Sequence, residues 1–283
     1  MKPSLSVIPD VNIGGTDLSA AKMISFHSIT PISSLKVKKI FLLSLLPFLL
    51  RATTVVALVT RDHIVIGVDS KLTVVTNQGG RGLRTAYRTT CKVLRQASAV
   101  YVAQGPHSPP FLDVREIISS SATFRFEDSI PLVREKIRLG LKHLMPLMRA
   151  NQPDYYSRFL TGLPIFSLYM GWRSGNTVAF RLLQFHLIRG GSDITVSEHI
   201  GPSPGGEVYY TIEGNEGGTD PIPDDWATQD HFKVVREGVE FGIKWHPEGS
   251  GPPIAIIEVS RSGISWHQNE KGVCNESTSN ALR

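Results

Sequence analysis

The sequence predicts an α+β protein in which helices cover sheets. Runs of β-branched residues at Thr53–Thr60 and Ile64–Asp69 indicate two strands joined by a short turn. The middle of the chain then changes to apolar residues at helical spacing, most clearly over Glu127–Ala150. Strand patterns return after this helix and continue almost to the C-terminus. We therefore expect one layered domain over residues 53–267, with sheets inside and helices outside.

The first half of this domain is expected to hold two hairpins. A polar, glycine-rich stretch, Thr73–Arg88, follows the first hairpin and is interpreted as a loop. Cys91–Leu94 and Ala99–Ala103 are predicted to form the second hairpin. The Gly105-Pro106 pair comes directly afterwards and is expected to end the sheet there.

The second half is predicted to alternate helices with strands. Phe111–Ser120 precedes the long helix Glu127–Ala150, for which Ser129 is a candidate N-cap residue. The remaining predicted elements are strands at Ile165–Gly171, Thr177–His186 and Glu207–Ile212, a helix at Asp230–Trp245, and a closing hairpin of Pro253–Val259 with Gly263–Trp266. Residues 268–283 are polar and are expected to form a disordered tail.

The basic character of the chain is concentrated before the predicted domain. The 283 residues carry a formal net charge of +5. Residues 1–52 contain six Lys and Arg residues but only two acidic residues. The rest of the chain is therefore nearly neutral, which argues against a nucleic-acid partner.

The sequence contains two cysteines, Cys91 and Cys274. One disulfide can form between them, but the pattern favours one thiol in the core and one in the tail. The histidines are scattered, and no Cys-x-x-Cys or His-x-x-x-His cluster indicates a structural metal. We expect neither a metal nor another cofactor.

Residues 1–52 are expected to lie outside the domain. Residues 1–34 show no period and are interpreted as disordered or as a spurious extension. Residues 35–52 combine a basic run, the apolar run Ile40–Leu50 and a final alanine, which is typical of a secretory signal peptide. A signal anchor over Ile40–Val59 and a cytosolic propeptide are the alternatives. A signal peptide predicts a secreted or periplasmic protein without a stable membrane partner, and a propeptide predicts a cytoplasmic one.

Removal of a leader that ends at Ala52 would make Thr53 the first residue of the chain. The hydroxyl of threonine is a poor nucleophile until a nearby base takes its proton. A free α-amine has a pKa of about 7.7–8.0 and is therefore a base near neutral pH. An N-terminal threonine thus carries the nucleophile and the base on one residue.

The segment from Thr53 to Thr73 resembles the opening of proteasome β-type subunits, which are N-terminal nucleophile (Ntn) hydrolases. In that family a Thr-Thr strand, a turn and an apolar strand ending in Ala-Asp-Ser-Arg-x-Thr follow one another. Here the second strand ends in Val-Asp-Ser-Lys-Leu-Thr. Lys92-Val-Leu is similar to the family's Lys-Val-Ile, and Ser250–Ile257 and Ser262–Trp266 are similar to its closing strands. The resemblance implies a four-layer αββα sandwich.

The resemblance also implies a threonine-type amide hydrolase, more specifically a peptidase, that acts on a peptide or amide substrate. Thr53 would attack the carbonyl group, and Lys92 would lower the pKa of its hydroxyl. Asp69 would keep the lysine charged and oriented. A backbone N–H near Gln104–Gly105 would stabilise the oxyanion, and Ser250 would help to position the new N-terminus.

The sequence departs from the family at two places. Pro247 and Glu248 stand where the family has a second positioning aspartate, and Glu213–Gly217 replaces its mid-chain serine loop. These departures favour a second hypothesis, a catalytically silent subunit with a structural or interaction role, as in α-type proteasome subunits. A third hypothesis is a membrane-tethered binding domain. Assembly into a homo-oligomer is a further expectation from the family.

Overall fold

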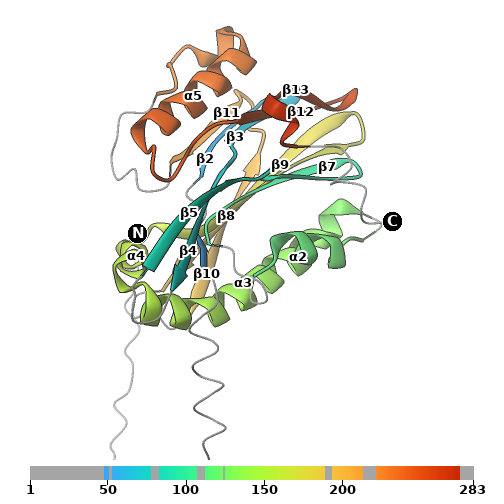
Figure 1. The fold of residues 1–283 in the computed structure, drawn as a ribbon. Helices are drawn as coiled ribbons and strands as arrows, with labels where there is room; N and C mark the ends of the chain where they lie inside the picture. Colours follow the sequence, from blue (N-terminus) through green and yellow to red (C-terminus); the bar gives the residue numbers. More distant parts are fainter. Residues whose placement is uncertain are drawn as a thin grey trace, which may run out of the picture.

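The computed structural model describes residues 48–50, 53–77, 83–106, 112–123, 125–188, 193–212 and 221–274. These residues form three antiparallel sheets and four α-helices, which confirms the predicted α+β class (Figure 1). No helix in these ranges is long and apolar enough to cross a membrane.

Sheet I has five strands in the order β11-β2-β3-β12-β13. Their bounds are β2 Thr54–Val59, β3 His63–Asp69, β11 Glu207–Ile212, β12 Ile254–Ser260 and β13 Gly263–Asn269. β2 is buried along its whole length, as is nearly all of β3. This burial on both faces explains why the two strands are continuous apolar runs. In the register of the sheet, Asp69 at the end of β3 lies opposite Ile254 at the start of β12.

Sheet II has five strands in the order β10-β9-β8-β7-β6. Their bounds are β6 Val93–Gln96, β7 Ala99–Gln104, β8 Pro164–Ser174, β9 Thr177–Leu187 and β10 Ile194–Gly201. The strands at β6 to β9 were predicted from sequence, whereas β10 was not. β10 is an edge strand with many half-buried or exposed side chains, so its sequence lacks a strong apolar pattern.

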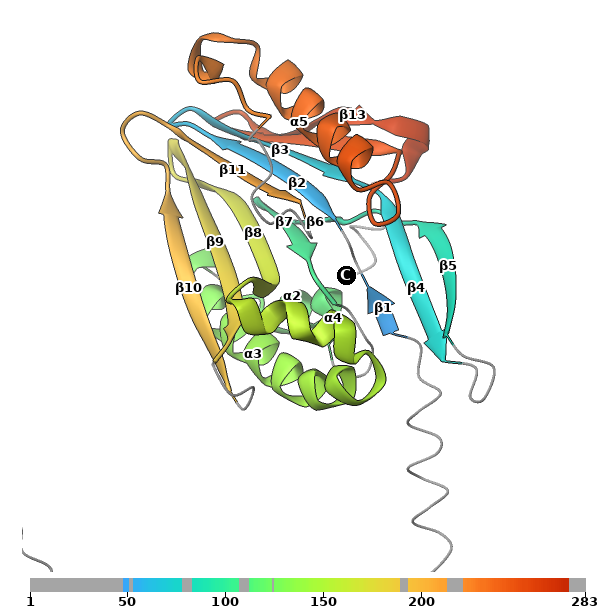
Figure 2. The same cartoon turned by 90° about the vertical axis from the view of Figure 1, so that its left-hand side faces the viewer.

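Sheet III has three strands in the order β1-β4-β5 (Figure 2). The bounds are β1 Phe48–Leu50, β4 Lys71–Asn77 and β5 Leu83–Thr89. The predicted loop over Thr73–Arg88 is therefore wrong, because most of this stretch forms the β4–β5 hairpin. β1 belongs to the predicted leader and pairs with β4 in the uncut chain. Residues 1–47 of the leader lie outside the described residues.

The four helices are α2 Val114–Ser120, α3 Phe126–Asn151, α4 Pro153–Arg158 and α5 His231–Trp245. Asp113 and Asp230 cap α2 and α5, because their side chains accept backbone N–H groups of the first turns. The prediction that Ser129 caps α3 is wrong. Arg125 occupies that position, and Ser129 lies inside the first turn, where its hydroxyl donates to the Phe126 carbonyl.

Three apolar clusters join the sheets and helices, whose layered arrangement Figure 1 shows. Val56 and Leu58 of β2 pack with Val235 and Val239 on α5, which covers the outer face of sheet I. The alternate residues of β2 face sheet II, as expected from the two-residue period of a strand. The third cluster joins the outer face of sheet II to α2 and α3.

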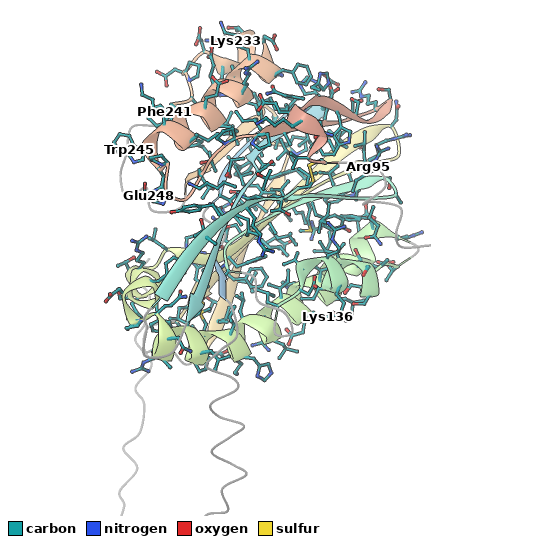
Figure 3. All side chains as sticks on the ribbon, viewed as in Figure 1. Arg95, Lys136, Lys233, Phe241, Trp245 and Glu248 are labelled. Atoms are coloured by element: carbon teal, nitrogen blue, oxygen red, sulfur yellow. A yellow bond between two sulfur atoms is a disulfide. The ribbon has the colours of Figure 1, made fainter. Side chains whose placement is uncertain are left out.

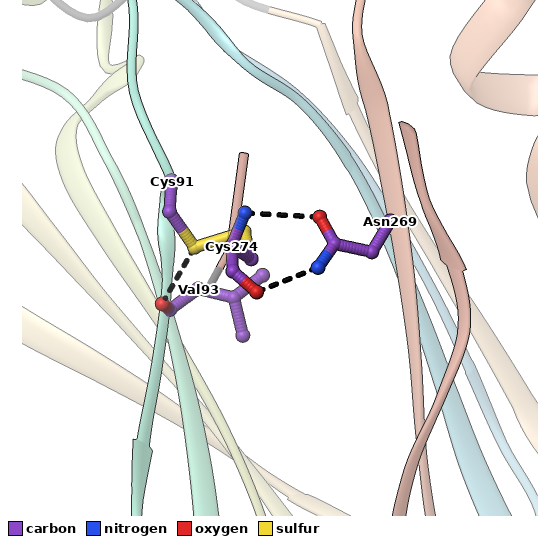
Figure 4. Close-up of a disulfide and its surroundings, with 4 residues drawn as sticks. All are labelled: Cys91, Val93, Asn269 and Cys274. Carbon is purple, nitrogen blue, oxygen red and sulfur yellow. Dashed lines mark hydrogen bonds between the residues drawn. A yellow bond between two sulfur atoms is a disulfide. The ribbon is translucent and has the colours of Figure 1, made fainter. Parts of the chain in front are cut away.

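The C-terminal part of the domain extends beyond the predicted boundary at residue 267. β13 continues to Asn269, and Cys274 forms a disulfide with Cys91, with the two Cα atoms 4.9 Å apart (Figure 4). The side chain of Asn269 accepts from the Cys274 N–H and donates to its carbonyl. The prediction of two separate thiols is therefore wrong, and so is the start of the tail at residue 268. Residues 275–283 lie outside the described residues.

Candidate functional site

The site is organised around the carboxylate of Asp69, which is completely buried at the end of β3. Lys92 Nζ lies 3.0 and 3.1 Å from the two carboxylate oxygens. The same oxygens accept backbone N–H groups from Thr54 at 2.9 Å, Lys71 at 3.1 Å and Gly251 at 3.1 Å. One side chain thereby joins the starts of β2, β4 and β6 to the turn before β12.

The Lys92–Asp69 ion pair is sealed from solvent, since both side chains are 0% exposed. Burial raises the pKa of the Asp69 carboxyl above its ordinary value, while the charge and hydrogen bonds of Lys92 act in the opposite direction. A buried ion pair contributes little net stability, because desolvation of two charges offsets their attraction. Its presence here therefore indicates a role in organising the site more than a role in holding the fold together.

Thr53 lies directly before β2 and is fully buried. Its carbonyl oxygen accepts a hydrogen bond from Gln104 Nε2 at 2.8 Å. The N–H at the other side of the same peptide group, that of Thr54, donates to Asp69. The Thr53–Thr54 peptide is therefore held at both ends, which fixes the backbone that carries the predicted nucleophile.

Gln104 and Gly105 follow one another at the end of β7. Gln104 contacts Thr53 through its side chain, which sequence reasoning missed because it considered only the backbone here. Gly105 has a φ of +119°, and a Cβ at this position would lie 2.5 Å from the Ile165 carbonyl oxygen. Only glycine suits this turn. The oxyanion role of a nearby backbone N–H stays a prediction.

Ser250 belongs to the same cluster, but its contact differs from the predicted one. Its Oγ accepts a hydrogen bond from Thr54 Oγ1 at 3.0 Å, so it acts on the residue after Thr53. α5 also approaches Thr54 closely, since a Cβ on Gly242 would lie 2.4 Å from Thr54 Oγ1. Thr54 and Gly251 are thus members of the site that sequence reasoning missed. The paired Thr53-Thr54 at the strand start was the available signal for Thr54.

The structure describes only one of the two places where the sequence departs from the family pattern. Glu248 is exposed beyond the end of α5 and pairs with His246 at 3.0 Å, so it does not replace a buried positioning carboxylate (Figure 3). The carbonyl of Pro247 accepts a hydrogen bond from Lys71 Nζ. Glu213–Gly217 lies outside the described residues.

Comparison of the sequence with protein-family models and with curated proteins finds no match. The resemblance to proteasome β-type subunits therefore depends on the quoted residues alone. Of these, the described structure brings Thr53, Asp69, Lys92, Gln104 and Ser250 into one buried cluster, with Gly105 next to it. Within the described ranges, no group of three or more His, Cys, Asp or Glu side chains could hold a metal ion.

Proposed function

We propose that this protein is a threonine-type Ntn amide hydrolase, a peptidase, that becomes active when residues 1–52 are removed. The observation that carries the proposal is the buried Lys92–Asp69 pair, which also fixes the peptide group directly after Thr53. The packing of α5 on sheet I, sheet I on sheet II, and sheet II on α2 and α3 supports an αββα sandwich.

The proposed reaction begins with Thr53 at the N-terminus. Its free α-amine takes the proton of the hydroxyl, and Oγ attacks the carbonyl carbon of the substrate amide. The C–N bond of the substrate breaks, the leaving amine receives the proton, and the acyl group remains as an ester on Thr53. Water then attacks this ester, which releases the acid and regenerates the hydroxyl. Two easier steps thus replace direct hydrolysis of the amide.

Lys92 and Asp69 act on the nucleophile through charge and position. The ammonium of Lys92 lowers the pKa of the Thr53 hydroxyl, and the low dielectric of the buried cluster strengthens this effect. Asp69 keeps the lysine charged and directed toward the start of β2. Gln104 and Ser250 hold the two residues that begin this strand, Thr53 and Thr54.

We also propose that the protein is exported, to the periplasm or out of the cell. Disulfides persist mainly in oxidising compartments, so the Cys91–Cys274 bond supports this location. A signal peptidase cut after Ala52 would produce the N-terminal threonine that the mechanism needs. Cleavage would also separate β1 from the chain, although β1 pairs with β4 before the cut. Afterwards the protein has no stable membrane partner.

The mass of the mature protein tests the first requirement, because it identifies the first residue. We expect a chain that begins at Thr53 and hydrolyses peptide amides. Thr53→Ala should abolish hydrolysis while retaining the fold, since the side chain loses only its hydroxyl and one methyl group at the start of a strand. Thr177→Ala, at an exposed strand start, is the matched control and should retain full activity. A mature chain that remains continuous through Ala52 would exclude the amine-base mechanism.

The second candidate is a catalytically silent subunit of the same fold. The exposed position of Glu248, paired with His246, favours it because no carboxylate there supports the N-terminus. This candidate predicts that a chain starting at Thr53 cleaves no member of a broad peptide library. It also predicts stable association of copies, measurable by sedimentation.

A further inference from the structure

A row of neutral polar side chains crosses three neighbouring strands of sheet II beside the site. Gln104 of β7 lies opposite Ser167 of β8, and Ser167 lies opposite Gln184 of β9. All three belong to the face of the sheet that is turned toward sheet I, as the alternation along each strand requires. Gln104 and Ser167 are 5% and 2% exposed.

The next row on the same face has the opposite character. Val102, Tyr169 and Leu182 lie opposite one another across the same three strands and belong to the apolar cluster between the two sheets. Burying polar side chains costs free energy unless they find hydrogen-bond partners. The change from an apolar row to a polar row therefore marks the position where the inter-sheet core ends.

A cavity of about 240 Å³ lies over the polar row. Its other walls are mainly aromatic and apolar, and they come from α4, the turn after it, the start of β8, and β11. Tyr155, Phe159, Pro164 and Tyr210 are among these residues. A mostly apolar cavity with a few polar groups at one side is the usual form of a small-ligand site.

Gln104 connects this cavity to Thr53. Its Nε2 donates to the Thr53 carbonyl, so its Oε1 is the atom left for another partner. That oxygen is buried and has no hydrogen-bond partner in the part of the chain that the structure describes. An unpaired buried acceptor is costly, and a donor on a bound ligand would remove the cost.

We propose that this cavity binds the substrate side chain next to the cleaved bond, and that the preferred side chain is tyrosine. This inference rests on the proposed function. A tyrosine ring is apolar and suits the aromatic walls, while its hydroxyl can donate to Gln104 Oε1 and accept from Ser167 or Gln184. Arg158 is the one charged residue among the described lining residues, and it is exposed. A charged side chain would therefore lack a buried partner.

Equilibrium binding tests the cavity separately from catalysis. The full chain carrying Thr53→Ala is titrated with the N-acetyl amides of tyrosine, phenylalanine and glutamine. We expect tyrosine to bind about tenfold more tightly than phenylalanine, the effect of one hydrogen bond to a buried acceptor. Equal binding of tyrosine and phenylalanine, or tighter binding of glutamine, would overturn the proposal. Selective binding by a protein without hydrolase activity would retain the cavity and reject only the enzyme.

Variants of the polar row make the test specific. Gln104→Leu removes the acceptor and should bring the preference for tyrosine over phenylalanine to unity, whereas Gln184→Leu and Ser167→Ala should each reduce it only in part, with phenylalanine binding unchanged or improved. Gln229→Leu and Ser174→Ala carry the same changes away from the cavity and should keep the full preference. If the mature enzyme is active, kcat/KM for matched peptides should follow the same order. A tyrosine preference that survives Gln104→Leu would show that another site selects the side chain.

Discussion

Strand β3 begins at His63 and ends at Asp69, and each end gathers ionisable side chains from distant parts of the chain. At the end of the strand, Asp69 and Lys92 are sealed from solvent. At its beginning, His63 is partly exposed and contacts His231, with Nε2 and Nδ1 2.7 Å apart, and Glu258, with Nδ1 and Oε1 3.7 Å apart. Both groups sit on the same buried strand, so exposure is the main difference between them.

This difference separates a permanent charge pair from a titratable one. Around Asp69, three backbone N–H groups and one ammonium fix the carboxylate, so its surroundings change little with conditions. His63, in contrast, lies near both a second histidine, His231, and the carboxylate of Glu258. The protonation state of His63 decides which of these two contacts is favourable. The sealed end suits chemistry that needs a preorganised charge, while the open end makes stability depend on pH.

Removing the lysine at the sealed end should have the largest effect. Lys92→Ala leaves Asp69 buried without its cation, so the free energy of unfolding should fall by about 3–5 kcal/mol. If the proposed mechanism holds, kcat should also fall at least about 100-fold, because a preorganised charge is lost. Urea unfolding and peptide hydrolysis measure the two effects. Lys244→Ala, on the exposed face of α5, is the control. A loss of less than about 1 kcal/mol of unfolding free energy for Lys92→Ala would contradict the contrast between the sealed and the open end of β3.

Opening the disulfide tests how the sealed end is held, because Cys91 directly precedes Lys92. The bond joins residues 183 positions apart, so it restricts the unfolded chain over most of the domain. The double variant Cys91→Ser and Cys274→Ser should lose about 2–4 kcal/mol of unfolding free energy. Thermal unfolding with and without a reductant provides the matched comparison. If the reductant shifts the double variant as much as the native chain, the stabilisation comes from elsewhere.

The sequence predicted the sealed end much better than its surroundings. β2 and β3 are buried on both faces, so their apolar runs were clear, and Asp69 and Lys92 were selected by resemblance to a known family. The contact of Gln104 could not be predicted, because the direction of a side chain at a strand end depends on tertiary packing. The disulfide escaped prediction because only the fold brings Cys91 and Cys274 together.

The β4–β5 hairpin was missed for a different reason. Its residues are mixed in polarity, and the visible glycines and polar residues between Asn77 and Leu83 suggested a loop along the whole stretch. Strands outside the main core need less apolar character, so local patterns indicate them weakly. The same reasoning applies to β10, the edge strand of sheet II.

The smallest expected effect is at the open end of β3. Burial, followed by the charge of His231, lowers the pKa of His63 below 6.5, although Glu258 and Asp62 act in the opposite direction and His267 reinforces the decrease. The unfolded chain therefore binds more protons than the folded chain once the pH falls through about 6.5.

Stability should accordingly decrease as the pH is lowered from about 7.5 to about 5.5, by less than about 1 kcal/mol because His63 is partly exposed. His63→Gln removes this titration and should flatten that part of the stability curve, while His143→Gln, far from the group, should leave it unchanged. Urea unfolding at several pH values measures the slope. An unchanged slope in His63→Gln would mean that the open end does not respond to pH, and the contrast between the two ends of β3 would then lie in burial alone.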